Sequence, residues 1–382
     1  MKVLFITDVY PSEQLPQYGI YLEQPAIELQ KLGVKIDVLC PLTSCVNTKT
    51  VFHGINVEYY NLHKQNKVKN LLSPKLEKSD FEFFKKRIDE SYDCVSLHFA
   101  NIKIVNAVVQ VCRQKGIKVV KHFHGLNPWK NYFEKHKLLA FINNITKKRV
   151  YKMLDGVVCV SEKVLQAYEK VKCKPQKFVV YNGVNCDMFA SNRQSFFLDG
   201  QIKILCAAKL METKGQRLLL EAIAPLIKSG INISLSLLGR GPDEQKLKET
   251  TKRLGIEQNV RFYGYLEYVE MPHFMAEHDL FVMPSYFEAI GCVYLEAMAS
   301  GMITVGVRTQ GIDEIIQDNK NGFLVNPKSI SDINSLICKI YSMSQAQLKD
   351  ISNAGVLTAK SFTWNKSAQE LIKVYQTLLE VK

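Results

Sequence analysis

The 382-residue sequence contains no Cys-x-x-Cys pair and no apolar run near the roughly 20 residues needed to span a bilayer. Its ten cysteines include several in apolar stretches, such as Cys159 and Cys206, which is typical of buried thiols in a reducing compartment. No ligand pair has zinc-site spacing, so no metal is expected. The first apolar run, 3–6, is too short for a signal peptide core. These absences predict a cytoplasmic protein, at most peripheral at the inner face of a membrane.

Acidic side chains are scarce in the first half. Residues 1–190 hold 29 basic against 17 acidic side chains, whereas residues 191–382 hold 21 against 20. This excess of basic side chains predicts an anionic partner, which could be a membrane surface, a phosphorylated acceptor or nucleic acid. The alternative is that the charge serves solubility alone. The stretch 127–152 mixes aromatic and basic residues, and a second basic patch lies within 64–78. The stretch is either a helix packed on a sheet with a wet basic face or a membrane-surface element.

Repeats and low-complexity tracts are also absent, and short apolar runs instead alternate with amphipathic stretches. This order predicts parallel sheets covered by helices. Strands are expected at 3–6, 34–39, 94–98, 118–123 and 156–160, and again at 203–207, 233–238, 260–263, 280–283 and 303–306; helices are expected over 20–32, 101–115 and 364–380. The sequence therefore predicts an α/β fold with two Rossmann-like domains, 1–187 and 201–360, joined by a polar linker, 188–200. Ligands of such sheets bind outside the carboxyl ends of the strands.

The segment 284–301 follows an expected strand and opens a helix. Gly291 allows close backbone approach, and the first helical N–H groups, of Cys292 and Val293, are free to bind an anion. Glu296 lies about 7–8 Å further along the helix axis, where the ribose of a bound nucleotide would lie. Glu288, before the helix, would face the other end of the ligand. Two carboxylates around a phosphate site suit a nucleotide sugar, although the spacing alone fits an ordinary loop as well.

The segment resembles the two-glutamate motif of retaining glycosyltransferase family 4, with seven residues between Glu288 and Glu296. Further motifs resembling that family lie at 155–161, 182–184, 208–215, 238–242, 311–316 and 321–325. The resemblance covers nearly the whole chain. It implies a GT-B fold, in which two Rossmann-like domains face each other across a cleft and the last helix, here 361–382, crosses back to the first domain.

The resemblance also implies roles for single residues. Lys209 and Lys214 would hold the diphosphate and neutralise charge on the departing nucleotide. Lys209 replaces the usual arginine and so lacks its planar fork. Gly239 is expected in a nucleotide-facing loop. Tyr265 follows another strand and either meets the base or belongs to a plain turn.

In the first half, His124 stands at an expected strand end beside a glycine, at the position that contacts the donor sugar in the family. His122 alternates onto the same sheet face, so the two histidines compete for this role. Gly19 resembles the glycine loop near the donor phosphates. The usual glycine pair is reduced to one here, which suggests acceptor contact instead.

The implied reaction transfers a sugar from a nucleotide sugar, expected to be a UDP-sugar, to an acceptor hydroxyl with retention of configuration. A sugar or lipid-linked sugar acceptor fits a role in cell-surface polysaccharide or glycolipid synthesis. No cofactor besides this co-substrate is expected. A metal ion is not expected either, because the sequence has no Asp-x-Asp pair near the proposed site. Two alternatives stay open: a sugar-nucleotide epimerase of the same architecture, and a non-enzymatic nucleic-acid-binding protein. Only the basic charge suggests the second alternative, because the sequence carries no RNA or DNA motif, so no nucleic acid is expected as a partner.

Overall fold

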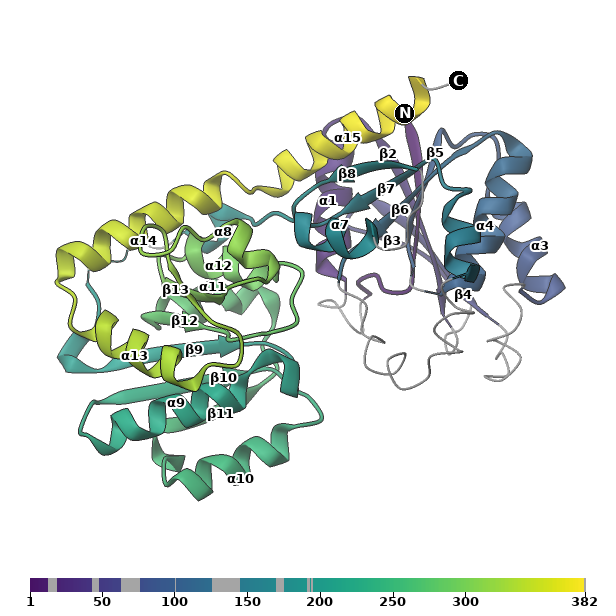
Figure 1. Ribbon diagram of the computed structural model, residues 1–382. Coiled ribbons are helices and arrows are strands. Elements are labelled where there is room, and N and C mark those ends of the chain that lie inside the picture. The colour runs from purple at the N-terminus through teal and green to yellow at the C-terminus, as the bar shows by residue number, and fades with distance from the viewer. Residues whose placement is uncertain are drawn as a thin grey trace. The chain divides into compact units, whose positions relative to one another are not determined.

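The computed structural model describes residues 1–12, 19–42, 48–62, 76–99, 101–125, 145–169, 175–190, 193 and 195–380. The chain divides into two compact units, Met1–Tyr181 with Trp364–Lys382, and Asn182–Thr363 (Figure 1). Most of the basic stretch 127–152 and the lysines between 64 and 75 lie outside the described residues. Of the helices that are described, none combines the length and apolar character needed to cross a membrane.

The first unit is built on an eight-stranded sheet in the order β3-β4-β2-β1-β5-β6-β7-β8. Every neighbouring pair is parallel except the antiparallel hairpin β3–β4. The strands are β1 Lys2–Thr7, β2 Lys35–Leu42, β3 Thr48–Phe52, β4 Ile55–Asn61, β5 Cys94–His98, β6 Lys118–Phe123, β7 Gly156–Cys159 and β8 Gln176–Val179.

Helices cover this sheet on both faces (Figure 1). Helix α3 (Lys78–Arg87) packs against α4 (Ile102–Lys115), and α7 (Glu162–Glu169) packs beside β7 and β8. Helix α1 (Ile20–Lys31) packs against the final helix, α15 (Trp364–Glu380). The apolar faces of α1 and α15 share one core with inward side chains of the strands, so the end of the chain completes the first unit.

The second unit holds a six-stranded, all-parallel sheet in the order β11-β10-β9-β12-β13-β14. Its strands are β9 Ile202–Ala207, β10 Ile233–Leu238, β11 Val260–Gly264, β12 Leu280–Val282, β13 Ile303–Val307 and β14 Phe323–Val325. Its helices are α8 Cys186–Phe189, α9 Gln216–Lys228, α10 Glu244–Leu254, α11 Met271–Ala276, α12 Cys292–Ala299, α13 Ile330–Tyr341 and α14 Gln345–Lys360. Helix α9 packs against α10 and α13, whereas α12 packs against α14 and α8. The predicted α/β class with two parallel-sheet, Rossmann-like units is confirmed.

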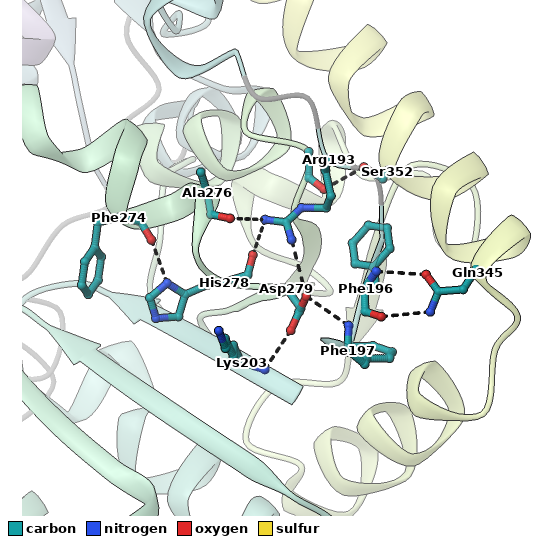
Figure 2. Close-up of polar contacts among 11 residues, drawn as sticks. Arg193, Phe196, Phe197, Lys203, Phe274, Ala276, His278, Asp279, Gln345 and Ser352 are labelled. Carbon is teal, nitrogen blue, oxygen red and sulfur yellow. Dashed lines mark hydrogen bonds and ion pairs between the residues drawn. The ribbon is translucent and has the colours of Figure 1, made fainter. Parts of the chain in front are cut away.

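Arg193 and residues 195–203, most of which were expected to form the linker, are fixed to the second unit (Figure 2). The Arg193 guanidinium donates to the carbonyl of Ala276 at 3.1 Å and forms an ion pair with Asp279 at 3.4 Å. Asp279 also accepts hydrogen bonds from the backbone N–H groups of Phe197, at 3.3 Å, and Lys203, at 3.0 Å. Because a buried arginine is stable only when paired, its polar partners hold this segment against the start of β12.

Candidate functional site

Both sheets contain a point where the strand order reverses, at β1 between β2 and β5 and at β9 between β10 and β12. Ligands of open α/β sheets bind at the carboxyl ends of the strands at such points. In the second unit, the loops after β9 and β12 carry Lys209, Lys214 and Glu288. In the first unit, β5 lies between β1 and β6, and β6 ends next to His124.

Glycines bring the loops of the second unit into backbone contact. A Cβ on Gly215, which has a φ of 77°, would lie 2.3 Å from the carbonyl oxygen of Pro284. A Cβ on Gly239 would lie 2.1 Å from the oxygen of Ala208. Neither position has room for a side chain, so glycine at both sites lets the loops after β9, β10 and β12 close on one another.

Two predicted site residues form an ion pair between these loops. The Lys214 ammonium donates to Oε2 of Glu288, and both side chains are largely buried. Two further hydrogen bonds hold Glu288 in place. Its backbone N–H donates to Gln310 Oε1 at 3.1 Å, and the Oε1 of Glu288 accepts from the N–H of Ala289 at 3.2 Å. Lys209 belongs to the same loop as Lys214, after β9, and its carbonyl accepts a hydrogen bond from the Gln216 side chain at 3.0 Å.

Helix α12 begins beside this pair. Its N-cap, Gly291, has a φ of 74°, and a Cβ there would lie 3.3 Å from the carboxyl carbon of Glu288. The N–H groups of Cys292 and Val293 belong to the first turn, which lacks intrahelical partners and carries the positive end of the helix dipole. Burial raises the pKa of the Cys292 thiol, so this side chain stays neutral. The structure thus presents a lysine and a helix start side by side, as an anion site requires.

Glu296 lies one turn further along α12, where it is buried to 8% exposure. Its Oε1 accepts a hydrogen bond from the Tyr268 hydroxyl at 3.0 Å. Burial raises the pKa of the Glu296 carboxyl to about 7, although the bond from Tyr268 acts in the opposite direction. Motif reasoning did not find Tyr268, because nothing in the spacing along the chain links it to Glu296.

Tyr265 lies in the turn after β11, at the edge of the second sheet. Its hydroxyl is 3.5 Å from Glu267 Oε2, and burial raises its pKa to about 12. The neighbouring Gly264 accepts a hydrogen bond from the Gly239 N–H at 2.6 Å, so the loops after β10 and β11 are joined. Tyr265 has no described contact with Lys214, Glu288 or Glu296.

In the first unit, Gly19 forms the N-cap of α1 with a φ of 97°. A Cβ at this position would lie 3.1 Å from the Cα of Tyr10, so glycine suits this position best. Two residues later, the Tyr21 ring lies 5.0 Å from the His124 ring, centroid to centroid. Gly19 and His124 therefore belong to one neighbourhood.

His124 is part of a cluster of three histidines. Its Nε2 lies 2.8 Å from Nδ1 of His98, and the rings of His98 and His122 stack with centroids 4.2 Å apart. Burial, with a contribution from the nearby Lys121 ammonium, lowers the pKa of His124 to about 3 and those of His98 and His122 well below the usual value. All three rings are neutral at pH 7. His98 ends a buried strand, and no sequence motif singles it out.

One possible role for this cluster is metal binding, since one nitrogen from each ring lies within 4.8 Å of the others. Two imidazole nitrogens on a tetrahedral zinc ion, each about 2.0–2.1 Å from the metal, would be roughly 3.3 Å apart. The 2.8 Å between His98 and His124 is instead a hydrogen-bond distance. The arrangement is that of a hydrogen-bonded chain.

Lys121 is a second group that the motifs did not single out. Its ammonium donates to the Phe99 carbonyl at 2.5 Å, and burial lowers its pKa to about 8 against the opposing charge of Asp8. The local sequence does not reveal this buried cation, since nothing in β6, which also contains Lys118 and His122, marks Lys121 as the buried lysine.

Solved structures with the same arrangement of elements define the class of fold. A structure of Anabaena HepE in complex with UDP has a TM-score of 0.75 at 19% identity and covers 99% of this chain and 100% of that one. Sucrose-phosphate synthase from Thermosynechococcus elongatus has a TM-score of 0.77 at 17% identity and covers 100% of each chain. At these identities the likeness shows the fold, which is of the GT-B class with two Rossmann-like units.

The family follows from matches to two family models. Residues 19–188 match the model described as Glycosyltransferase Family 4, and residues 188–356 match the model described as Glycosyl transferases group 1. The chain belongs to this glycosyltransferase family, which confirms the resemblance carried by Glu288 and Glu296.

Curated relatives agree with this assignment. An uncharacterized glycosyltransferase from Methanocaldococcus jannaschii is 24% identical over 401 residues, covering 100% of this chain and 99% of that protein. Mannosylfructose-phosphate synthase from Agrobacterium fabrum is 30% identical over 193 residues, covering 48% of this chain and 42% of that protein.

Proposed function

We propose that the chain transfers a hexose or a related sugar from a nucleotide sugar to an acceptor hydroxyl, with retention of anomeric configuration. One observation carries the proposal: the Lys214–Glu288 pair, the start of α12 and the buried Glu296 lie in succession along one stretch of the second unit. The order of charges matches a nucleotide sugar, with a cation and N–H groups for the diphosphate and carboxylates for hydroxyl groups on either side.

The proposed division of labour follows from these positions. Lys214 and Lys209, with the N–H groups of Cys292 and Val293, hold the diphosphate and stabilise charge on the leaving nucleotide. Glu296, oriented by Tyr268, binds ribose hydroxyls. Glu288 binds hydroxyls of the transferred sugar once the diphosphate competes for Lys214.

A UDP-sugar is the proposed donor. The structures of HepE, which share the fold, contain UDP, UDP with glucose, and UDP-glucose. A thermal-shift screen of UDP-, GDP- and ADP-sugars tests this choice, because a ligand at 100 times its Kd stabilises the native state by about 2.7 kcal/mol. Stabilisation by UDP-sugars and not by the others supports the proposal. A chain that no nucleotide sugar stabilises would contradict it.

The matched variants for this screen are Glu296→Gln and Glu288→Gln. Loss of the charge at Glu296 weakens nucleotide binding, because hydrogen bonds to a charged group contribute about 1.5–3 kcal/mol. Loss of the charge at Glu288 lowers turnover more than nucleotide affinity. Release of a changed nucleotide sugar without any acceptor would indicate an epimerase instead.

We also propose a lipid-linked acceptor at an anionic membrane surface, in polysaccharide or glycolipid synthesis. The support is the excess of 12 basic side chains in residues 1–190. Each lysine or arginine near such a surface contributes about 1 kcal/mol, and salt screens the attraction. Co-sedimentation with anionic vesicles at low salt, lost at high salt, is the expected result. Absence of binding at low salt would remove the membrane surface and leave the transferase proposal intact.

A further inference from the structure

A chain of hydrogen bonds leads from the C-terminal helix to the end of β6 within the first unit. Tyr375 on α15 donates from its hydroxyl to Ser96 Oγ at 3.3 Å. Ser96 Oγ also lies 3.0 Å from Nε2 of His98 and 2.8 Å from Nε2 of His122. Nδ1 of His98 continues the chain to His124. Ser96, His98 and Tyr375 are not part of the proposed site, and their connection to His124 calls for a role.

The hydrogens in this chain can be counted. A neutral imidazole carries hydrogen on one nitrogen only, so its other nitrogen accepts. A serine hydroxyl has a single hydrogen to donate. Because Ser96 accepts from Tyr375, it donates to one of His98 and His122 and accepts from the other. The direction of this one hydroxyl therefore sets the tautomers of both rings.

The same direction sets the tautomer of His124. When Ser96 donates to His122, His98 donates from Nε2 to Ser96 and accepts on Nδ1 from His124, which leaves Nδ1 of His124 as an acceptor. When Ser96 donates to His98, the order reverses and Nδ1 of His124 carries hydrogen. This atom is buried and has no hydrogen-bond partner among the described residues. Orphaned buried N–H donors are rarer in proteins than acceptors without a donor, so the first order is favoured.

We propose that Ser96 and His98 are positioning residues that hold His124 as the tautomer with an accepting Nδ1, ready for a hydroxyl hydrogen of a sugar substrate. The sugar substrate rests on the proposed function, whereas the tautomer does not. Tyr375 extends the same role to the final helix, because its hydroxyl occupies one acceptor site of Ser96. Packing supports the geometry: the ring of Phe5 lies 4.7 Å from that of His98, and Tyr21 contacts His124.

The experiment is a ¹⁵N spectrum of the full chain labelled at histidine, which distinguishes the two neutral tautomers of each ring. For His124 we expect hydrogen on Nε2 in the native protein. His98→Phe keeps a ring beside Phe5 but removes both nitrogens, so the His124 signals move toward the average of the two tautomers. Ser96→Ala, a smaller change, produces the same shift in weaker form.

His278 in the second unit is the internal control. Its Nδ1 lies 2.7 Å from the Phe274 carbonyl, which only accepts, and its Nε2 lies 2.7 Å from Ser236 Oγ. His278 therefore carries hydrogen on Nδ1 in the native chain and in each variant. A native His124 with hydrogen on Nδ1, or a His124 tautomer unchanged in both variants, would overturn the proposal.

Kinetics supply a second reading. His98→Phe should lower kcat about tenfold and change KM for the nucleotide sugar less than about twofold, because His98 orients a reacting-site group without touching the nucleotide. A change confined to KM would contradict a positioning role. Failure of the native chain to transfer sugar would count against the proposed function alone, since the tautomers are read without substrate.

Discussion

The two units share a parallel-sheet design, yet they present different side chains at the carboxyl ends of their strands. In the second unit, charged groups meet across glycine-packed loops, as in the pair Lys214–Glu288. In the first unit, the cluster around His124 consists of neutral, buried rings joined by hydrogen bonds. Charge held by tightly fixed backbone suits a diphosphate, whereas neutral donors and acceptors suit hydroxyl groups. Because the two units have similar folds, the chemistry that each can perform depends on the side chains at its strand ends and not on the fold.

The largest expected effect is on the glycine packing of the second unit. Gly239→Ala places a Cβ 2.1 Å from the Ala208 oxygen at a φ of 135°, so we expect the free energy of unfolding to fall by about 2–4 kcal/mol. Gly255→Ala is the matched control, with a φ of 70° and no atom within 4 Å of the new Cβ. It should cost about 1–2 kcal/mol. Thermal unfolding of both variants measures the difference, and equal losses would show that the loops are not locked together.

The next effect tests the neutral cluster. His124→Ala removes the proposed sugar-binding group and should lower kcat at least about tenfold, which is about 1.4 kcal/mol of barrier. His122→Ala should cost less, because the hydrogen bonds that connect His122 to His124 run through Ser96 and His98. Steady-state kinetics decide between them. A larger loss at His122 would move the substrate contact to that residue.

A smaller effect concerns the charge on Glu296. Its pKa, raised to about 7 by burial, leaves the carboxyl protonated at pH 6 and ionised at pH 8. The contribution of this group to the free energy of unfolding is therefore fully present below pH 4.5, which is the ordinary pKa of a glutamate carboxyl. It is lost as the pH rises through about 7. Nucleotide binding runs the other way, since ribose hydroxyls bond more strongly to a carboxylate.

We expect affinity for a nucleotide sugar to rise about three- to tenfold between pH 6 and pH 8. A nucleotide sugar is the right ligand, because a terminal phosphate would itself titrate near pH 6. Calorimetric titration measures the affinity, and Glu296→Gln should give a flat profile. A native profile as flat as that of the variant would show that ionisation of Glu296 does not matter.

The smallest expected effect is that of chelation. In the proposed mechanism, lysines and the start of α12 balance the diphosphate charge without a metal, so activity should stay within about twofold after EDTA treatment. Transfer assays with and without EDTA test this. Loss of activity that Mn²⁺ or Mg²⁺ restores would assign part of the diphosphate charge to a metal.

Much of the candidate site in the second unit could be proposed from the sequence, because several of its residues are close together along the chain. Gly291, the N-cap of α12, lies five residues before Glu296 on that helix, so helix geometry alone relates the two positions. The strands at 94–98, 118–123 and 233–238 and the helix at 364–380 were predicted with the bounds that the structure shows. Apolar periodicity is strong where elements are buried in a parallel sheet.

Contacts between residues that are far apart in the sequence could not be predicted from spacing. Tyr268 meets Glu296 across 28 positions, and Tyr375 meets Ser96 across 279. Contacts of this kind depend on tertiary packing, for which one sequence carries no spacing rule. The hairpin β3–β4 was also not predicted, since strand β3 is largely exposed and lacks an apolar pattern.

The contrast between the units is tested most directly by affinity for a UDP-sugar in two variants of the full chain, measured by calorimetry. Lys214→Met removes the cation and leaves Glu288 unpaired, and both changes oppose a diphosphate, so Kd should rise at least about tenfold. His124→Ala should leave Kd within about twofold of the native value while kcat falls. The opposite result would be an unchanged Kd in the Lys214 variant and a raised Kd in the His124 variant. It would place nucleotide binding in the first unit and contradict the roles proposed here for the two units.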